Sequence, residues 1–195
     1  MLKNVIKEMN TLGINVVSRA KSNLSKNNSS GDLSNSLTYE IDQTDPDDVK
    51  LNFYGLDYAN FVDQGVQGKD PQAMPQGSMS RYNKAPMSPY QFGTGSYSGG
   101  GSLRGSIDKW VVQKGIPNVR DAKGKFIKRK TMVYLISRSI WYTGIKPTYF
   151  FTNAQDEEAQ GVQLKFATAY SRDLSEQLKN KVDILTFGLC LIARK

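Results

Sequence analysis

The sequence predicts an α+β fold, in which long helices at the two ends of the chain pack a small antiparallel sheet. Apolar residues recur every three or four positions from Leu2 to Leu24, which is typical of an amphipathic helix. Residues 37–43 and 49–55 alternate polar and apolar side chains, as half-buried strands do. A second helical pattern, after residue 153, closes the chain. A long insertion rich in Gly, Pro, Ser and Tyr interrupts these elements.

The length of 195 residues predicts a single domain over residues 1–195, large enough to bury a core. Charged residues occur throughout the first helix, and no apolar run reaches the length that spans a bilayer. We therefore expect a soluble, unprocessed protein with no membrane partner.

The first half of the chain contains the predicted hairpin. The first helix should end in the polar loop at residues 23–31. The acidic sequence Thr44-Asp45-Pro46-Asp47-Asp48 is a turn signal between the two strands. A short helix over residues 57–64 follows, which Asp57 could cap and Gly65 should end.

Residues 66–104, which we call the arm, differ from the rest in composition. They hold four prolines and many Gly and Ser residues, which predicts a loop. A loop of this length without secondary structure of its own is unusual in a compact domain. They also hold aromatic residues, which disordered linkers usually lack. We interpret the arm as an insertion that becomes ordered against a neighbouring subunit, and a flexible surface loop is the alternative. Its candidate interface residues are Tyr82, Tyr90, Phe92 and Tyr97.

Three helices are predicted after the arm. Ser106 can cap the first, over residues 107–114. The second should begin near residue 131 and end at Gly144, and Pro147 then prevents a return to helix. Asn153 can cap the third. The apolar residues 184–193 are too few to span a membrane, and we predict a strand there, added to the sheet or to a neighbour.

Positive charge is concentrated in the second half. Residues 1–100 carry nine basic and ten acidic residues, whereas residues 101–195 carry seventeen and eight. The densest region, residues 120–130, is called the basic stretch below. It either contacts DNA phosphates or is a bland surface loop, which stays solvated or docks on an acidic patch of a neighbouring assembly. Its cations are Arg120, Lys123, Lys125, Lys128, Arg129 and Lys130.

Catalytic and metal-binding signals are missing from the sequence. There is no histidine and only one cysteine, which excludes imidazole-based triads, the usual zinc sites and an intrachain disulfide. Counted from Asp45, a calcium loop would need glycine where Lys50 stands and an acid where Leu56 stands. The glycine-rich residues 93–101 lack the Gly-Lys-Ser/Thr ending of a phosphate loop. We expect no enzyme activity and no cofactor.

Three segments, in order, resemble the tail-completion or neck proteins of tailed bacteriophages. The first is Gly31-Asp32-Leu33-Ser34-Asn35-Ser36, followed by two predicted strands and Tyr58-Ala59-Asn60-Phe61-Val62-Asp63-Gln64-Gly65. The second is the Trp110 helix that ends in Lys114-Gly115-Ile116. The third is Ser139-Ile140-Trp141-Tyr142-Thr143-Gly144-Ile145-Lys146-Pro147, followed by Phe150 and a long helix. The resemblance covers about residues 30–165.

The resemblance implies a virion structural protein, made in the cytoplasm of a bacterial host. Copies would form a homo-oligomeric ring joining the portal or connector and adaptor proteins of the head to the tail proteins, with possible sequence-independent contact to passing DNA. The arm is longer than in the family, and residues 184–195 form an extra C-terminal extension. Motif residues that we assign to the subunit's own fold, with the aromatics facing inward, are Tyr58, Gly65, Trp110, Gly144, Pro147 and Phe150.

A second hypothesis comes from a different class of protein. The excess of Lys and Arg in the second half also suits a non-catalytic DNA-binding protein. Against it, the basic residues cluster in one stretch and form no concentrated face on a predicted helix.

Overall fold

The computed structural model describes residues 2–25, 31–45, 48–74, 81–93, 103–117, 119–120 and 123–192, with the backbone alone for 183–192. The described chain is mixed α+β, as predicted, with long terminal helices packing small antiparallel two-stranded sheets. The contacts between its residues divide the chain into two compact units. The terminal unit comprises Met1–Leu56 and Phe150–Lys195, and the middle unit comprises Asp57–Tyr149.

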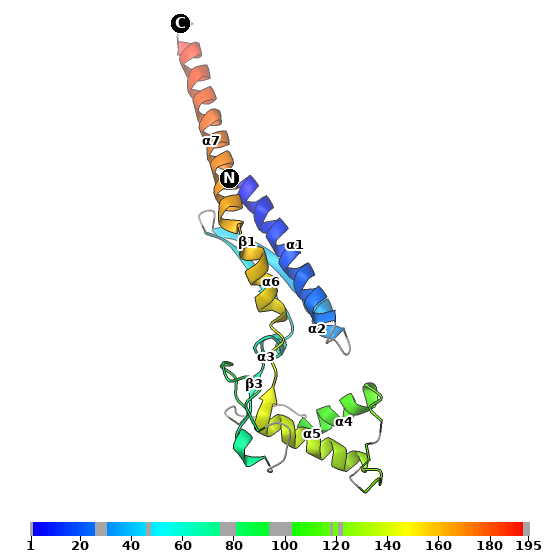
Figure 1. Cartoon of the computed structure of the whole chain (residues 1–195). Helices are drawn as coiled ribbons and strands as arrows, with labels where there is room; N and C mark the ends of the chain where they lie inside the picture. Colours follow the sequence, from blue (N-terminus) through cyan, green and yellow to red (C-terminus); the bar gives the residue numbers. More distant parts are fainter. Residues whose placement is uncertain are drawn as a thin grey trace. The chain divides into compact units, whose positions relative to one another are not determined.

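The terminal unit is built on α1 (Lys3–Ser25), which packs against α6 (Phe150–Ala159) and α7 (Val162–Ile192) (Figure 1). The short helix α2 (Asp32–Ser36) leads into the hairpin of β1 (Thr38–Asp45) and β2 (Asp48–Tyr54). The first helix and the hairpin are present as predicted, and Tyr39 of β1 lies opposite Phe53 of β2. The core of this unit comes from one face of α1 and from the closing helices: Met9, Val16, Ala20, Leu24, Phe150, Ala154 and Ala169.

The hairpin packs against α1 at a glycine. A methyl group added at Gly13 would overlap the ring of Tyr39, so the absence of a side chain allows that ring to lie on the helix. The Tyr39 hydroxyl donates a hydrogen bond to Asn10 Oδ1 at 2.6 Å. On another side of α1, Arg19 forms ion pairs with Glu157 and Glu158 of α6.

The predicted closing helix is present, but it starts earlier and is divided in two. Asn153 lies inside α6 and does not cap it, and Gly161, with φ of +76°, separates α6 from α7. The predicted strand after residue 184 is wrong, because α7 is helical to Ile192. Extending an existing helix adds one hydrogen bond per residue without a new nucleation step, which favours helix in a segment that directly continues one.

The middle unit contains α3 (Ala59–Gln64), η1 (Pro71–Ala73), α4 (Leu103–Gln113) and α5 (Arg129–Thr143). Its small sheet pairs β3 (Val66–Gln67) with β4 (Gly144–Ile145) in antiparallel fashion. The helices α4 and α5 enclose a cluster of buried and half-buried apolar residues: Ile107, Val111, Ile116, Ile127, Met132, Val133 and Ile136.

Two predicted caps are wrong in this unit. Ser106 lies within α4, which begins at Leu103. The short helix begins after Tyr58, and Asp57 is not its cap. The predicted end of the long helix at Gly144 is confirmed.

Candidate functional site

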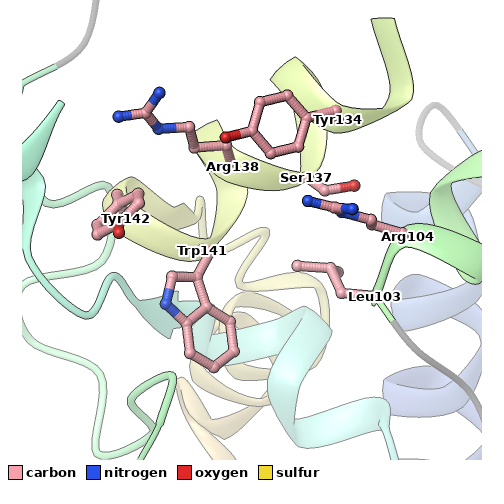
Figure 2. Close-up of a pocket in the computed structure, with 7 residues that line it drawn as sticks. All are labelled: Leu103, Arg104, Tyr134, Ser137, Arg138, Trp141 and Tyr142. Atoms are coloured by element: carbon pink, nitrogen blue, oxygen red, sulfur yellow. The ribbon is translucent and has the colours of Figure 1, made fainter. Parts of the chain in front are cut away.

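A cavity of about 500 Å³ lies beside α4 and α5 in the middle unit (Figure 2). The start of α4 contributes two wall residues, and α5 from Tyr134 onward contributes the others. Positions 134, 138, 141 and 142 of α5 share one side of the helix, whereas Met132, Val133 and Ile136 face the core. The wall residues, which we call the arginine pocket, are Leu103, Arg104, Tyr134, Ser137, Arg138, Trp141 and Tyr142.

Two guanidinium groups give the pocket its charge. The Cζ atom of Arg104 lies 4.6 Å from the ring centroid of Tyr134, and that of Arg138 lies 5.9 Å from the centroid of Tyr142. Neither arginine forms an ion pair with a carboxylate in the part of the chain that the structure describes. A guanidinium over an aromatic face keeps its N–H groups in its own plane, where they can bind a carboxylate or a phosphate.

The remaining walls are aromatic and hydroxylic. Trp141 packs against Phe92 with ring centroids 5.5 Å apart. The Ser137 hydroxyl already donates to the carbonyl of Val133 at 2.7 Å. The wall residues include no carboxylate, imidazole or thiol. The pocket is therefore suited to binding an anionic group next to an apolar one, and its walls offer no acid–base pair or activated nucleophile.

Two glycines at the C-terminal end of α5, Gly144 directly after it and Gly68 packed against it, determine where the pocket's aromatic residues lie. Gly144 has φ of +89°, and a Cβ there would overlap the carbonyl oxygen of Val66. A Cβ on Gly68 would overlap the carbonyl of Tyr142. Because these positions lack side chains, the two backbones approach closely, and Lys69 N–H donates to Trp141 O at 3.0 Å. This contact holds the C-terminal end of α5 in place.

The basic stretch lies in the connection between α4 and α5 and in the first turn of α5. Within this connection, Arg120 and Phe126 form an isolated antiparallel bridge. The Arg120 guanidinium lies 4.3 Å from the ring centroid of Phe126, and Arg129 forms an ion pair with Asp108 at 3.0 Å. All six cations of the stretch are exposed, namely Arg120, Lys123, Lys125, Lys128, Arg129 and Lys130.

The described part of the arm packs on its own chain, and its contact with a neighbouring subunit stays a prediction. Tyr90 packs edge-on against Phe61 at 4.6 Å, and Phe92 contacts Trp141. The Ser88 hydroxyl donates to Gly65 O at 2.7 Å. Backbone hydrogen bonds to Gln67 also hold this segment, which explains why its rings turn inward. Tyr82 is 64% exposed, and Tyr97 lies outside the described residues.

The six motif residues divide into two groups. Gly65, Gly144 and Phe150 are buried and Pro147 is half-buried, as expected of residues that shape the fold. The inward orientation expected for Tyr58 and Trp110 is wrong, because they are 43% and 38% exposed. Tyr58 precedes the first turn of α3, and the core face of α4 is centred on Ile107 and Val111, which leaves Trp110 at its edge.

Sequence reasoning missed three charged residues that the structure makes prominent. Arg104 and Arg138 did not stand out, although Tyr134, Arg138 and Trp141 follow helical spacing and carry a usable signal. Asp173 did not stand out either. It follows Val162, Phe166 and Ala169 at helical spacing, which places an acid on the face that packs against α1.

Asp173 is buried at the start of α1, with 1% of its surface exposed. Its carboxylate accepts hydrogen bonds from the backbone N–H of Asn4 at 2.9 and 3.0 Å and of Val5 at 3.0 Å, and from Asn4 Nδ2 at 2.8 Å. Burial raises the pKa of Asp173, but the hydrogen bonds from Asn4 and Val5 lower it, and the pKa lies below its ordinary value. The residue caps the first helix from a position 169 residues along the chain.

The described residues contain no cluster of three or more His, Cys, Asp or Glu side chains that could hold a metal ion. Within the same residues, no helix has the length and apolar character needed to cross a membrane. Comparison with known proteins also gave no match, whether to protein-family models, to curated proteins or to solved structures.

Proposed function

We propose that this chain is a structural protein of a tailed bacteriophage, forming a homo-oligomeric ring in the neck that joins the head to the tail. On this proposal its mechanism is the formation of interfaces, with portal, connector or adaptor proteins on one side and tail proteins on the other. Its place of action is the assembled virion.

The observation that carries the proposal is the contact between two of the segments that resemble the neck family. They lie about eighty residues apart in the sequence, yet Tyr149 N–H donates to Asp63 O at 2.9 Å and Thr148 N–H donates to Val62 O at 3.2 Å. A Cβ on Gly65 would lie 2.5 Å from Ile145 O. Residues 62–65 and 144–149 of the resemblance thus form one structural element, in which glycine is required at Gly65 and Gly144.

The charge of the two units also favours assembly. The middle unit holds fourteen basic and five acidic residues, and the terminal unit holds twelve and thirteen, so the net charges are +9 and −1. A closed ring needs two different patches on each subunit that fit each other. A subunit with unequal charge in its two units can supply such patches.

The proposal is tested in the phage that encodes the chain. Its gene is disabled, and the particles are examined by electron microscopy. We expect filled heads and complete tails that are not joined. Joined, infectious particles would exclude a neck role, and the same phage with the gene restored is the control.

The DNA-binding hypothesis is kept as the second candidate because the middle unit carries all of the excess positive charge. In that case, the isolated protein should bind duplex DNA as a monomer, with an affinity that falls steeply between low and physiological salt. Weak DNA binding together with a stable oligomer supports the neck role. The basic stretch then faces either the passing DNA or a neighbouring ring.

A further inference from the structure

The arginine pocket carries positive charge that no described carboxylate neutralises. The guanidinium of Arg104 lies over the ring of Tyr134, and that of Arg138 lies over the ring of Tyr142. In Figure 2 both guanidinium groups extend from the helices that border the cavity. A cavity of about 500 Å³ is large enough to take several side chains of a partner. Its chemistry calls for an anionic group beside apolar atoms.

The same chain carries an acidic segment of matching type. The hairpin from Thr38 to Tyr54 holds five acidic residues and one basic residue, a net charge of −4. Asp45 and Asp48 lie opposite each other in the register at the end of the two strands, where both are exposed, and Asp48 also forms an ion pair with Lys50 at 2.8 Å. Asp42 accepts hydrogen bonds from Thr44 N and Oγ1 at 2.9 and 2.5 Å, which shapes the turn. The described acids at the hairpin end are Asp42, Asp45 and Asp48.

We propose that the arginine pocket of one copy receives the acidic hairpin end of the next copy. This inference rests on the ring proposed above and names its subunit contact. Each subunit has one hairpin and one pocket, so the contact joins different patches on successive copies, as a ring requires. Arginine pairs with carboxylates through two N–H groups at once, which fixes the orientation of the hairpin as well as attracting it.

The pocket is a better receptor for the hairpin than the basic stretch. The basic stretch is an exposed connection rather than a cavity, and its Arg129 already pairs with Asp108. The pocket combines a concave surface with two arginines that lack such a partner among the described side chains. The basic stretch therefore does not receive the hairpin in this proposal and is available for a different partner.

The test exchanges the charges and then mixes the proteins. One variant carries Arg104→Glu and Arg138→Glu, and the other carries Asp45→Lys and Asp48→Lys. Each alone places like charges at the contact, so its dissociation constant for self-association should rise by roughly tenfold or more. Mixed in equal amounts, each variant offers the partner that the other needs. We expect the mixture to associate again in sedimentation or light-scattering measurements.

Matched controls carry the same change of charge elsewhere. Lys109→Glu with Lys114→Glu alters two exposed residues, one in α4 and one directly after it, and Asp156→Lys with Glu176→Lys alters two exposed residues of the terminal unit. These controls should associate as the unaltered protein does. Circular dichroism and thermal melting of every variant establish that a loss of association does not come from unfolding.

Three results would overturn the inference. If the unaltered protein is a monomer at all concentrations, the ring proposal itself fails. If it is an oligomer that the arginine exchange leaves intact, or if mixing restores nothing, the ring stands and the hairpin-to-pocket contact fails. If the arginine exchange abolishes binding of a labelled single-stranded oligonucleotide while the oligomer persists, the pocket is a nucleic-acid site.

Discussion

At the residue scale, Asp173 combines burial with a full set of hydrogen bonds. The first backbone N–H groups of a helix have no partner within the helix, and here a carboxylate from α7 accepts from those of Asn4 and Val5. The negative charge also lies at the positive end of the helix dipole. One side chain therefore links the beginning of α1 to the closing helix.

Replacing Asp173 by Asn should destabilise the terminal unit by about 1–2 kcal/mol, because the capping charge is lost. Denaturant unfolding followed by circular dichroism measures the change. Asp156→Asn, an exposed position on α6, is the matched control and should change stability little. Equal effects of the two substitutions would contradict the capping role.

The capping contribution should also depend on pH. The folded-state pKa of Asp173 lies below its ordinary value, so its stabilisation is complete above the ordinary carboxylate pKa and is lost as pH falls through the folded value. The difference in melting temperature between the unaltered protein and the Asn variant should therefore shrink from neutral pH toward acid pH. A difference that stays constant down to the lowest pH at which both proteins fold would contradict this.

Gly144 and Gly115 allow a second test at single residues. Both have positive φ, +89° and +60°, but only a Cβ at Gly144 meets nearby backbone, whereas the space beside Gly115 is open. Gly115→Ala should cost about 1–2 kcal/mol from its left-handed conformation alone. Gly144→Ala should cost at least about 3 kcal/mol, because strain adds to the overlap with Val66 O. Equal losses of stability for the two substitutions would mean that the backbone of Val66 moves away from the added Cβ at position 144 without cost.

At the element scale, α7 divides into a packed part and an unpacked part. Ala169 and Asp173 are buried in the terminal unit, whereas Leu174, Leu178 and Val182 are 45%, 56% and 60% exposed. The orange-to-red part of α7 continues past the N-terminal end of α1 (Figure 1). Residues 174–182, all exposed, thus gain little from tertiary packing.

Hydrogen exchange should reveal this division. At concentrations where the protein is a monomer, amides of residues 164–173 should exchange more slowly than those of residues 177–182, because packing raises the free energy of local opening. Mass spectrometry of peptides from the two regions measures the rates. The control is α4, which packs on α5 through Val111 and should be protected in its centre. Uniform protection along α7 would contradict the prediction.

The sequence predicted the elements whose signals are local. The spacing of Val16 and Ala20 defined α1, the alternation around Tyr39 and Phe53 defined the hairpin, and Gly144 marked the end of α5. The strand predicted after residue 184 failed for a local reason, because residues 184–192 continue α7 without a new nucleation step. Other failures depended on contacts from far along the chain, since periodicity did not show that Tyr90 would meet Phe61. The arginine pocket was missed for the same reason, since Arg104 meets Tyr134 only through the packing of α4 on α5.

At the scale of the whole molecule, each unit can be observed separately. Both tryptophans, Trp110 and Trp141, belong to the middle unit, so tryptophan fluorescence reports on that unit alone. Gly144→Ala should lower the melting temperature seen by fluorescence. Asp173→Asn should leave the fluorescence transition in place and shift the transition seen by circular dichroism. If both substitutions shift both signals equally, the two units unfold as one.

The order of the units along the chain has a consequence for synthesis. The middle unit is continuous, but the terminal unit is completed only by residues that follow it, and α1 acquires its cap from Asp173. A ribosome adds about 5–20 residues per second, so α1 waits on the order of ten seconds for the helices that cover its apolar face. The middle unit can fold on the nascent chain during that interval. Although α1 is made before the middle unit, it is buried after it, and its Met9, Val16 and Leu24 form an apolar surface that a chaperone can bind during that interval.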